Sequence, residues 1–287
     1  MVALGIVTVW AAPALANVVL LGSDRSLQNK EAIAAARQVG PEFSFADEDS
    51  NDAAEQLRHA DVVLAIGVRA LVMARTVAPD KPVVYAMVPA AEALPSKTVT
   101  GVAWEVPAYA QFAEWKQLRF DGLRVGVLYH PKSSAASLAD ATKAAAALGL
   151  TLVARPLSDS AKLSETLAEL GPKIDALWVA PDDALFPAAT IRTLVAFARK
   201  SHVALLGYSD AFTDAGALAS MAPDARDIGR RAARMALGIA GRAPEQRLPV
   251  PPPTSSPGTL SLNAVTAAEL GIDLPETLLH KARKVVH

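Results

Sequence analysis

Two segments of this chain, far apart in the sequence, follow the same plan. Residues 61–88 contain, in order, the strand-like run Asp-Val-Val-Leu-Ala-Ile-Gly, a helical stretch over 68–76 and a second apolar run. Residues 175–208 contain, in the same order, Asp-Ala-Leu-Trp-Val-Ala-Pro, a helical stretch over 188–201 and a second apolar run. A buried strand, a helix and another buried strand are typical of a βαβ unit in a parallel sheet. The repeat therefore predicts an α/β protein with two similar lobes.

The rest of the chain continues the alternation of strands and helices. A proline-rich stretch over 249–257 cannot join the centre of a sheet, and we interpret it as a segment that crosses between the lobes. We expect a final amphipathic helix that ends at Val286. The other expected strands are 17–22, 42–47, 98–104, 123–129, 151–156, 217–221 and 260–262, and the other expected helices are 26–39, 52–59 (capped by Asn51 or Asp52), 107–119, 137–148, 162–170, 225–239 and 264–270.

The amino-acid composition agrees with two globular lobes and excludes several classes of function. The 287 residues are enough for two domains, and 52% apolar with 20% charged residues can fill two cores. A formal net charge of −1 leaves no basic excess for phosphates, so we expect no nucleic-acid partner. The chain has no cysteine, which excludes disulfides, thiolate metal sites and thiol nucleophiles, and which suits an exported protein.

The first residues favour export. An apolar stretch from Val2 to Ala12 is followed by Ala14-x-Ala16, the small-x-small pattern that signal peptidase accepts. We expect residues 1–16 to be the last part of a signal peptide, with cleavage before Asn17. The apolar stretch is too short to span a bilayer, so the mature protein should not cross the membrane. The alternative is that the apolar run up to Val9 forms a buried first strand.

Several short stretches, in order and spacing, carry a resemblance to a known family. They are Thr100-Gly101-Val102, the run from Arg124 to Pro131 (Arg-Val-Gly-Val-Leu-Tyr-His-Pro), Asp175-Ala176-Leu177-Trp178, Gly207-Tyr208-Ser209-Asp210-Ala211-Phe212, Gly216-Ala217-Leu218-Ala219, and Leu262-Asn263 through Ala268-x-Leu270-Gly271-Ile272-x-Leu274-Pro275. From Asn17 onward the chain resembles the periplasmic substrate-binding proteins of ABC transporters, in the group that includes tryptophan- and tyrosine-binding members.

The resemblance implies a type I periplasmic-binding fold, with two Rossmann-like lobes, a hinge of crossing strands and a ligand between the lobes. Lobe 1 would comprise residues 17–105 with about 224–248, and lobe 2 residues 106–223 with about 249–287. It also implies a periplasmic, monomeric protein without a cofactor or a metal, which passes a small polar or amino-acid-like ligand to an ABC permease and its ATPase. A ligand-binding envelope sensor without a transporter is one alternative.

Loops at the carboxyl ends of parallel strands are where α/β sheets bind ligands. The residues that these loops offer are Ser23, Gly67, Arg69, Pro89, Trp104, Tyr129, His130, Ser133, Asp182, Asp183, Tyr208 and Ser209. Trp104, Tyr129 and Tyr208 would supply an aromatic wall, although Tyr129 and Tyr208 also suit core packing. For Trp178 we expect core packing.

Charge gives the most specific expectation about the ligand. Arg69 begins a helix, where backbone N–H groups and a guanidinium suit an anion, but it would equally pair with a surface carboxylate. Asp182 and Asp183 hold the corresponding place in the second copy, where acids suit an amine but also cap helices. A ligand with both an anionic and a cationic group would satisfy both copies.

The second alternative function is that of a small-molecule hydrolase with the same fold. The five histidines (His59, His130, His202, His280 and His287) form no His-x-x-x-His or His-Glu pair. The sequence has no Gly-x-Ser-x-Gly elbow and no phosphate-binding Gly-x-x-x-x-Gly-Lys loop. We therefore expect a binding protein without catalytic residues.

Overall fold

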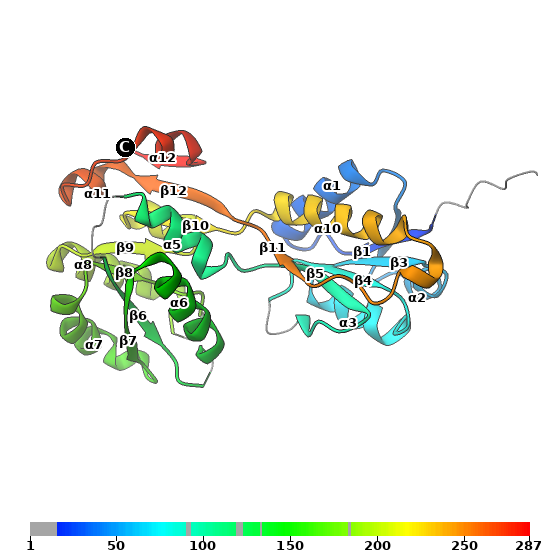
Figure 1. Ribbon diagram of the computed structural model, residues 1–287, viewed down its shortest axis with the longest axis horizontal. Coiled ribbons are helices and arrows are strands. Elements are labelled where there is room, and N and C mark those ends of the chain that lie inside the picture. Colours follow the sequence, from blue (N-terminus) through cyan, green and yellow to red (C-terminus); the bar gives the residue numbers. More distant parts are fainter. Residues whose placement is uncertain (1–15, 90–92, 119–122, 133, 183–184) are drawn as a thin grey trace, which may run out of the picture. The chain divides into compact units, whose positions relative to one another are not determined.

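The computed structural model describes residues 16–89, 93–118, 123–132, 134–182 and 185–287. These residues form two compact units, and the chain passes from one unit to the other three times. Unit 1 contains the chain up to Val102 together with Gly229–Pro253. Unit 2 contains Ala103–Ile228 and Thr254–His287. Figure 1 shows a sheet with helices on its two faces in each unit.

Unit 1 is built on a six-stranded sheet with the order β11-β5-β4-β3-β1-β2. Strands β1 to β5 pair in parallel, and every residue of β1, β3 and β4 is buried because helices cover both faces of the sheet. The strands of this sheet are β1 (Val18–Gly22), β2 (Ser44–Asp47), β3 (Val62–Ile66), β4 (Val83–Ala86), β5 (Val99–Ala103) and β11 (Thr254–Ser255), the last formed by the first two residues of the Thr254–His287 segment. The helices of unit 1 are α1 (Leu27–Val39), α2 (Ala53–Arg58), α3 (Val68–Val77) and most of α10 (Ala225–Ala240).

Unit 2 is built on a seven-stranded sheet with the order β13-β12-β10-β9-β8-β6-β7. Its pairs are parallel except for β10 with β12, which run antiparallel. Its strands are β6 (Arg124–Tyr129), β7 (Thr151–Pro156), β8 (Ala176–Trp178), β9 (Ala204–Gly207), β10 (Ala219–Ala222), β12 (Thr259–Asn263) and β13 (Lys284–Val286), and its helices are α5 (Ala108–Lys116), α6 (Ala135–Leu148), α7 (Leu163–Leu170), α8 (Ile191–Ser201), α9 (Asp210–Ala215), α11 (Ala264–Glu269) and α12 (Glu276–Lys281).

The two sheets have the same core topology. The order β5-β4-β3-β1-β2 in unit 1 matches β10-β9-β8-β6-β7 in unit 2, so the strands of the two sequence copies hold equivalent places. The prediction of two Rossmann-like lobes with parallel sheets is confirmed. The proline-rich stretch contributes only β11, at the edge of the first sheet, where a proline-flanked strand costs fewest hydrogen bonds.

Two expectations about local structure are wrong. The chain is not helical up to Val286, because α12 ends at Lys281 and residues 284–286 form the edge strand β13 beside β12. The valine pair in β13 suits a half-buried strand better than an exposed helix end. Helix α2 has Asp52 at its cap position, but the carboxylate accepts from Ser50 Oγ (2.6 Å) and Gln56 Nε2 (2.7 Å) and makes no capping bond.

The aspartate that opens each copy has a structural role that the sequence did not reveal. Asp61 accepts a hydrogen bond from the N–H of Asn17, just before β1, at 2.8 Å. Asp175 accepts one from the N–H of Arg124, the first residue of β6, also at 2.8 Å. Each aspartate therefore ties the start of the third strand of its unit to the start of the first.

Each of the two aspartates also binds the side chain of an arginine. The Arg124 guanidinium binds Asp175 at two oxygens, with Nη2 to Oδ1 at 2.7 Å, and Arg247 Nη1 binds Asp61 Oδ1 at 2.6 Å. The hydrogen bond from the Arg124 side chain lowers the pKa of Asp175, against the effect of partial burial. Burial raises the pKa of Asp61, but the Asn17 and Arg247 hydrogen bonds outweigh it and lower this pKa overall.

The Asp175 link predicts a pH-dependent part of the stability of unit 2. Because the pKa is lowered in the folded state, Asp175 stabilises the fold above its unfolded value near pH 4, and this contribution disappears as the pH falls through the folded value. Asp175→Asn should therefore reduce the free energy of unfolding at pH 7 and make little difference near pH 2. Urea unfolding of the chain that begins at Asn17, followed by tryptophan fluorescence, measures this, since three of the four tryptophans (Trp104, Trp115 and Trp178) lie in unit 2 and the fourth, Trp10, precedes Asn17. An equal loss at both pH values would contradict it.

Trp178 lies in the core of unit 2, as expected, with 3% of its surface exposed. Its indole N–H donates to Gln111 Oε1 at 3.0 Å. Gln111 is itself 1% exposed and donates through Nε2 to the Val106 carbonyl at 2.9 Å. This buried chain of hydrogen bonds joins β8 to α5 and to the residues that precede α5.

Candidate functional site

The carboxyl ends of the parallel strands are the candidate binding edge of each unit. In unit 1 the strand order reverses direction between β1 and β3, and in unit 2 between β6 and β8. At such a reversal the following loops leave toward opposite faces of the sheet and open a crevice. Ser23 and Gly67 follow the first pair of strands, and His130 follows the end of β6.

In unit 1 a polar network occupies this edge. The buried Ser23 donates from Oγ to Glu48 Oε1 at 3.1 Å, and the Glu48 side chain is only 7% exposed. Arg69 contacts the same oxygen of Glu48 through Nη1 at 3.5 Å and donates from Nη2 to Asp49 Oδ1 at 2.9 Å. Arg25 contacts the other oxygen of Asp49 at 2.5 Å. Two carboxylates and two guanidiniums thus alternate beside the ends of β1, β2 and β3.

Arg69 is therefore paired with carboxylates of its own unit, the alternative that the sequence left open. The hydrogen bond and the charge of Asp49, with the charge of Glu48, raise the pKa of Arg69 above its usual value. Its side chain remains 59% exposed, so the guanidinium still has donors that face solvent. Its role toward a ligand stays a prediction.

Gly67 lies at the cap position of α3, where the backbone turns with φ at 100°. A side chain there would be strained, and a Cβ would come 3.0 Å from Nδ2 of Asn29 on α1. Glycine lets the start of α3 approach the start of α1 at this edge. Pro89 after β4 and Trp104 after β5 are both half-buried.

At the carboxyl ends of the unit 2 strands, Ser134 and Asp182 form the main hydrogen-bond network. Ser134 is 6% exposed, and its Oγ donates to Asp182 Oδ2 at 2.6 Å and accepts from the N–H of His130 at 3.0 Å. Asp182 Oδ1 accepts from the N–H of Leu185 at 3.2 Å. Asp182 therefore closes a turn, and the expectation that it caps the following helix is wrong, because the cap position of α8 is held by Thr190. His130 Nδ1 accepts from the N–H of Lys132 at 3.2 Å.

The aromatic candidates of unit 2 belong partly to its core. Tyr208 is half-buried, packs on Phe212 with ring centroids 5.1 Å apart, and donates to the Phe186 carbonyl at 3.5 Å. Tyr129 is also half-buried, and Ser209 begins α9 without a side-chain capping bond. Ser133 and Asp183 lie outside the described residues.

Sequence reasoning missed four members of these networks, Arg25, Glu48, Asp49 and Ser134. Glu48 and Asp49 directly follow β2, and the acidic run Asp47-Glu48-Asp49 at the end of this short strand was the available signal. Ser134 had no signal, because its burial and its bond to Asp182 depend on two segments that are 48 residues apart. Among the described residues no group of three or more His, Asp or Glu side chains is arranged to hold a metal ion. No helix within the described part of the chain is long and apolar enough to cross a membrane.

Comparison with known families gives one match that spans nearly the whole chain. The family described as ABC transporter substrate binding protein matches residues 6–286. No curated protein matches the sequence.

Solved structures with the same fold include several substrate-binding proteins. A ligand-free, open substrate-binding protein with adhesive properties from Clostridium difficile has a TM-score of 0.73 at 16% identity, over 94% of this chain and 99% of that chain. A domain from Streptococcus pneumoniae in complex with L-Trp has a TM-score of 0.58 at 22% identity, over 95% and 100%. A conserved domain protein from Vibrio cholerae has a TM-score of 0.57 at 20% identity, over 95% and 100%.

Proposed function

The chain belongs to the family of ABC transporter substrate-binding proteins, and from this we propose that it captures a small polar or amino-acid-like molecule outside the cytoplasm for an ABC importer. The family match over residues 6–286 is the observation that carries the proposal. The partners would be a permease and its ATPase, and the protein would act as a monomer without catalysis. An amino acid is the first ligand class to test, since the similar Streptococcus pneumoniae domain is in complex with L-Trp.

We propose that the ligand contacts the strand ends of both units. In unit 1 the contact groups would be Ser23, the N-terminus of α3 at Gly67, and Arg69. In unit 2 they would be His130 and Asp182, with the aromatic side chains Trp104, Tyr129 and Tyr208. A guanidinium that faces solvent suits a carboxylate, and a carboxylate suits an amine, so both charged groups of an amino acid would have partners.

We also propose that the protein is exported to the periplasm and that residues 1–16 are removed. The support is the small-x-small pattern at Ala14 and Ala16 and the position of β1, which starts two residues after Ala16. N-terminal sequencing of the protein from its native host should find Asn17 first. Recovery of the soluble protein with Met1 would refute the proposal.

The function is tested by identifying what the purified protein retains. Mass spectrometry of the native protein should reveal a small molecule, and adding that molecule to the emptied protein should raise the melting temperature. A hundredfold excess over Kd corresponds to about 2.7 kcal/mol of added stability. The molecule should be recovered chemically unchanged. Steady turnover that is abolished by His130→Ala would instead establish the hydrolase.

Arg69→Ala should weaken the binding of a carboxylate ligand about 30-fold or more, because loss of one partner leaves a desolvated charge unpaired, at a cost of about 2 kcal/mol or more. Arg58→Ala is the matched control, since Arg58 ends α2, next to the Asn17–His59 contact at the opposite edge of the sheet. Calorimetric titration with the identified ligand measures both variants. Undiminished affinity in Arg69→Ala would show that the Glu48–Asp49 pair keeps this guanidinium from the ligand.

A further inference from the structure

Asn17, which the proposed cleavage would make the first residue of the chain, is bound through each of its polar groups. Its N–H donates to Asp61 Oδ2 at 2.8 Å, and its carbonyl accepts from the N–H of Asp61 at 2.8 Å and from that of Val62 at 3.3 Å. Its side chain donates to the His59 carbonyl at 3.2 Å and accepts from Ser44 Oγ at 3.3 Å. The Asn17 nitrogen is therefore held against one carboxylate oxygen.

In unit 2 the equivalent carboxylate oxygen binds a cation. Arg124 holds there the place of Asn17, since each N–H donates to the aspartate of its copy and each carbonyl accepts from the N–H of that aspartate. Arg124 also donates from Nε to the same oxygen, Asp175 Oδ2, at 3.2 Å. In unit 1 the residue at this place is an uncharged asparagine, and Arg247 binds the other oxygen of Asp61, Oδ1. A cation at the Asn17 nitrogen would give Asp61 Oδ2 the charge that Asp175 Oδ2 receives.

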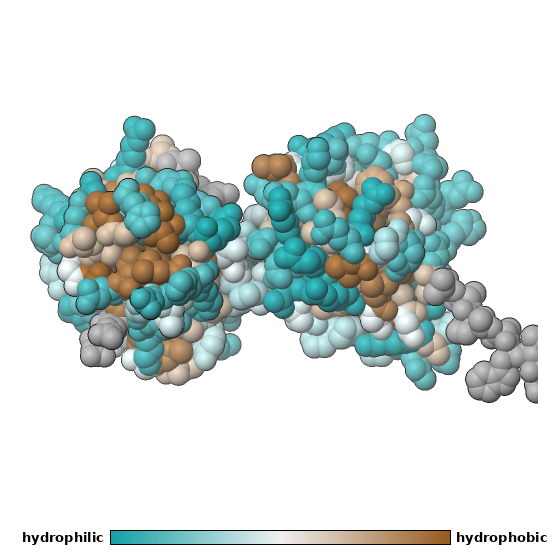
Figure 2. Space-filling model, turned by 90° about the horizontal axis from the view of Figure 1, so that it is seen from above, coloured by the Kyte–Doolittle hydropathy of each residue, from teal (hydrophilic) through white to brown (hydrophobic). Residues whose placement is uncertain are grey.

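Water reaches the Asp61 carboxylate, which limits the strength of any ion pair that it forms. The Asp61 side chain is 41% exposed, although Arg247, which binds it, is buried. Hydrophilic residues cover most of the side of unit 1 that Figure 2 shows, with smaller apolar areas between them. A partly exposed pair changes the ratio of folded to unfolded protein by a factor of about three, and salt weakens it.

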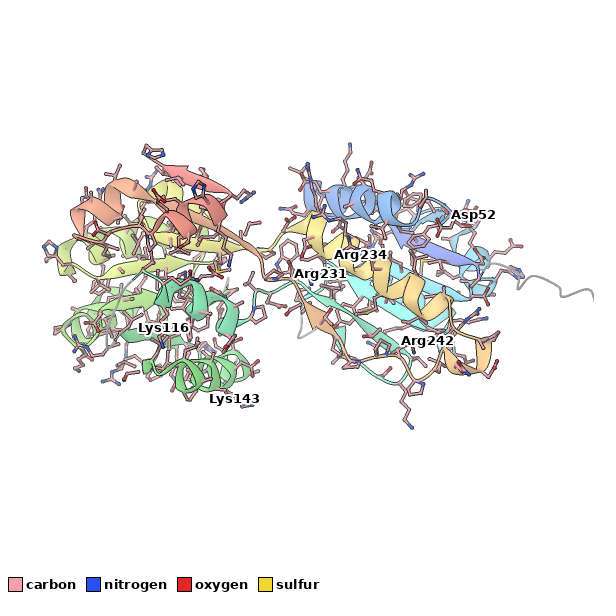
Figure 3. All side chains as sticks on the ribbon, turned by 45° about the horizontal axis from the view of Figure 1, so that its top comes forward. Asp52, Lys116, Lys143, Arg231, Arg234 and Arg242 are labelled. Carbon is pink, nitrogen blue, oxygen red and sulfur yellow. The ribbon has the colours of Figure 1, made fainter. Side chains whose placement is uncertain are left out.

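The surroundings of the Asn17 nitrogen suit a positive charge. Asn17 lines a hollow on the surface of unit 1 together with Asp52 and Glu55. Figure 3 shows Asp52 at the end of unit 1 where β1 starts. Nearby carboxylates favour the charged form of an amine. The titratable and charged residues around this position are Glu42, Asp52, Glu55, Arg58, His59, Asp61, Lys81 and Arg247.

We propose that Asp61 is the binding site of the processed amino terminus, where the α-ammonium group of Asn17 forms an ion pair with Asp61 Oδ2. Hydrolysis of the Ala16–Asn17 bond joins the oxygen of water to the Ala16 carbonyl carbon, and the Asn17 nitrogen leaves with the bonding electrons and is protonated to an ammonium. Removal of residues 1–16 then stabilises unit 1, because a charged donor replaces an amide at a nitrogen that is already in place. The proposal rests on the proposed cleavage before Asn17.

Two chains that differ only in their first residues test the ion pair. One begins at Asn17 and the other at Ala14, and both are released from a fusion partner by a protease in vitro, so the comparison does not depend on export. At about pH 6.5 the chain that begins at Asn17 should have an about threefold higher ratio of folded to unfolded unit 1, measured by urea unfolding with circular dichroism. Asp61 raises the pKa of the α-amino group in the folded state, so this stabilisation is fully present below the unfolded value near 8 and is lost as the pH rises through the folded value. The two chains should be equally stable at about pH 10.

Variants of both chains assign the effect to one carboxylate. Asp61→Asn should abolish the difference between the two chains at about pH 6.5. Glu55→Gln is the matched control, because it removes an acid of the same hollow and should leave the difference unchanged. Equal stability of the two wild-type chains at this pH would overturn the proposal. A difference that persists in Asp61→Asn, or that disappears equally in Glu55→Gln, would also overturn it.

A titration of the α-amino group tests the pair without any variant. Followed by NMR in the chain that begins at Asn17, this group should lose its proton at a higher pH than the amine of the free peptide Asn-Val-Val-Leu. Loss of the proton at the same pH in both would overturn the proposal. Whether the cell makes this terminus is decided separately by N-terminal sequencing of the native protein, so failure of the ion pair and failure of the cleavage proposal are distinguishable.

Discussion

Replacing Gly229 with alanine should destabilise unit 1 by about 3 kcal/mol, the upper end of what overpacking costs. Gly229 lies on α10 where this helix crosses α1 (Figure 1), and a Cβ at this position would be 2.2 Å from the carbonyl oxygen of Ala32 and 2.9 Å from its carbonyl carbon. These are backbone atoms of a helix, so they cannot move aside as a flexible side chain can. The two helices would have to separate, and the buried alanines between them would lose contact.

Gly238 on the same helix is the matched control. A Cβ at Gly238 would meet nothing within 4 Å, so Gly238→Ala should stabilise unit 1 by about 0.5 to 1 kcal/mol through the lower flexibility of the unfolded chain. Urea unfolding by circular dichroism measures both variants. Tryptophan fluorescence of the same variants, in the chain that begins at Asn17 and so lacks Trp10, reports on unit 2 and serves as the internal reference. Similar unfolding midpoints in the two variants would mean that the crossing of α1 and α10 can relax without cost.

Gln111→Leu should destabilise unit 2 by about 3 kcal/mol. The substitution keeps the bulk of a buried side chain but removes the acceptor of the Trp178 indole N–H and the donor to the Val106 carbonyl. Each buried group left without a partner costs about 1 to 3 kcal/mol. Tryptophan fluorescence during urea unfolding measures the loss, and Trp178→Phe in the Gln111→Leu background should recover part of it by removing one of the two orphaned groups.

Trp115, on the same helix as Gln111, differs from Trp178 in the hydrogen bonding of its indole N–H. It is 1% exposed, packs on Phe112 with ring centroids 5.7 Å apart, and its indole N–H has no hydrogen-bond partner among the described residues. Trp115→Phe therefore removes a group that is already unsatisfied, whereas Trp178→Phe orphans Gln111 Oε1. Trp115→Phe should cost less stability than Trp178→Phe, and the reverse order would show that the Trp178–Gln111 bond contributes nothing net.

The sequence determined the architecture because burial on both faces of a parallel sheet leaves a long, recognisable apolar signal. The runs at β3 and β8 and the helices after them predicted the two α/β units without any contact information. Short elements at the edge of a sheet were harder to predict from the sequence. The last three-residue strand, β13, was expected to be helical, because its pairing with β12 is a long-range contact that the local pattern does not encode.

For the candidate site, too, one part was predictable from the sequence and another part was not. The topology of a parallel sheet places Ser23, Arg69 and His130 at strand ends, and the sequence predicted those positions. Only the tertiary structure decided which charges meet. Arg69 pairs with Asp49, which lies in the turn after β2, two strands away from β3 in the sheet, and Asp182 accepts from Ser134 across 48 residues of sequence. Periodicity predicts which side of a strand or helix is buried, but hydrogen-bond partners depend on distances of about 3 Å between side chains that only the folded chain brings together.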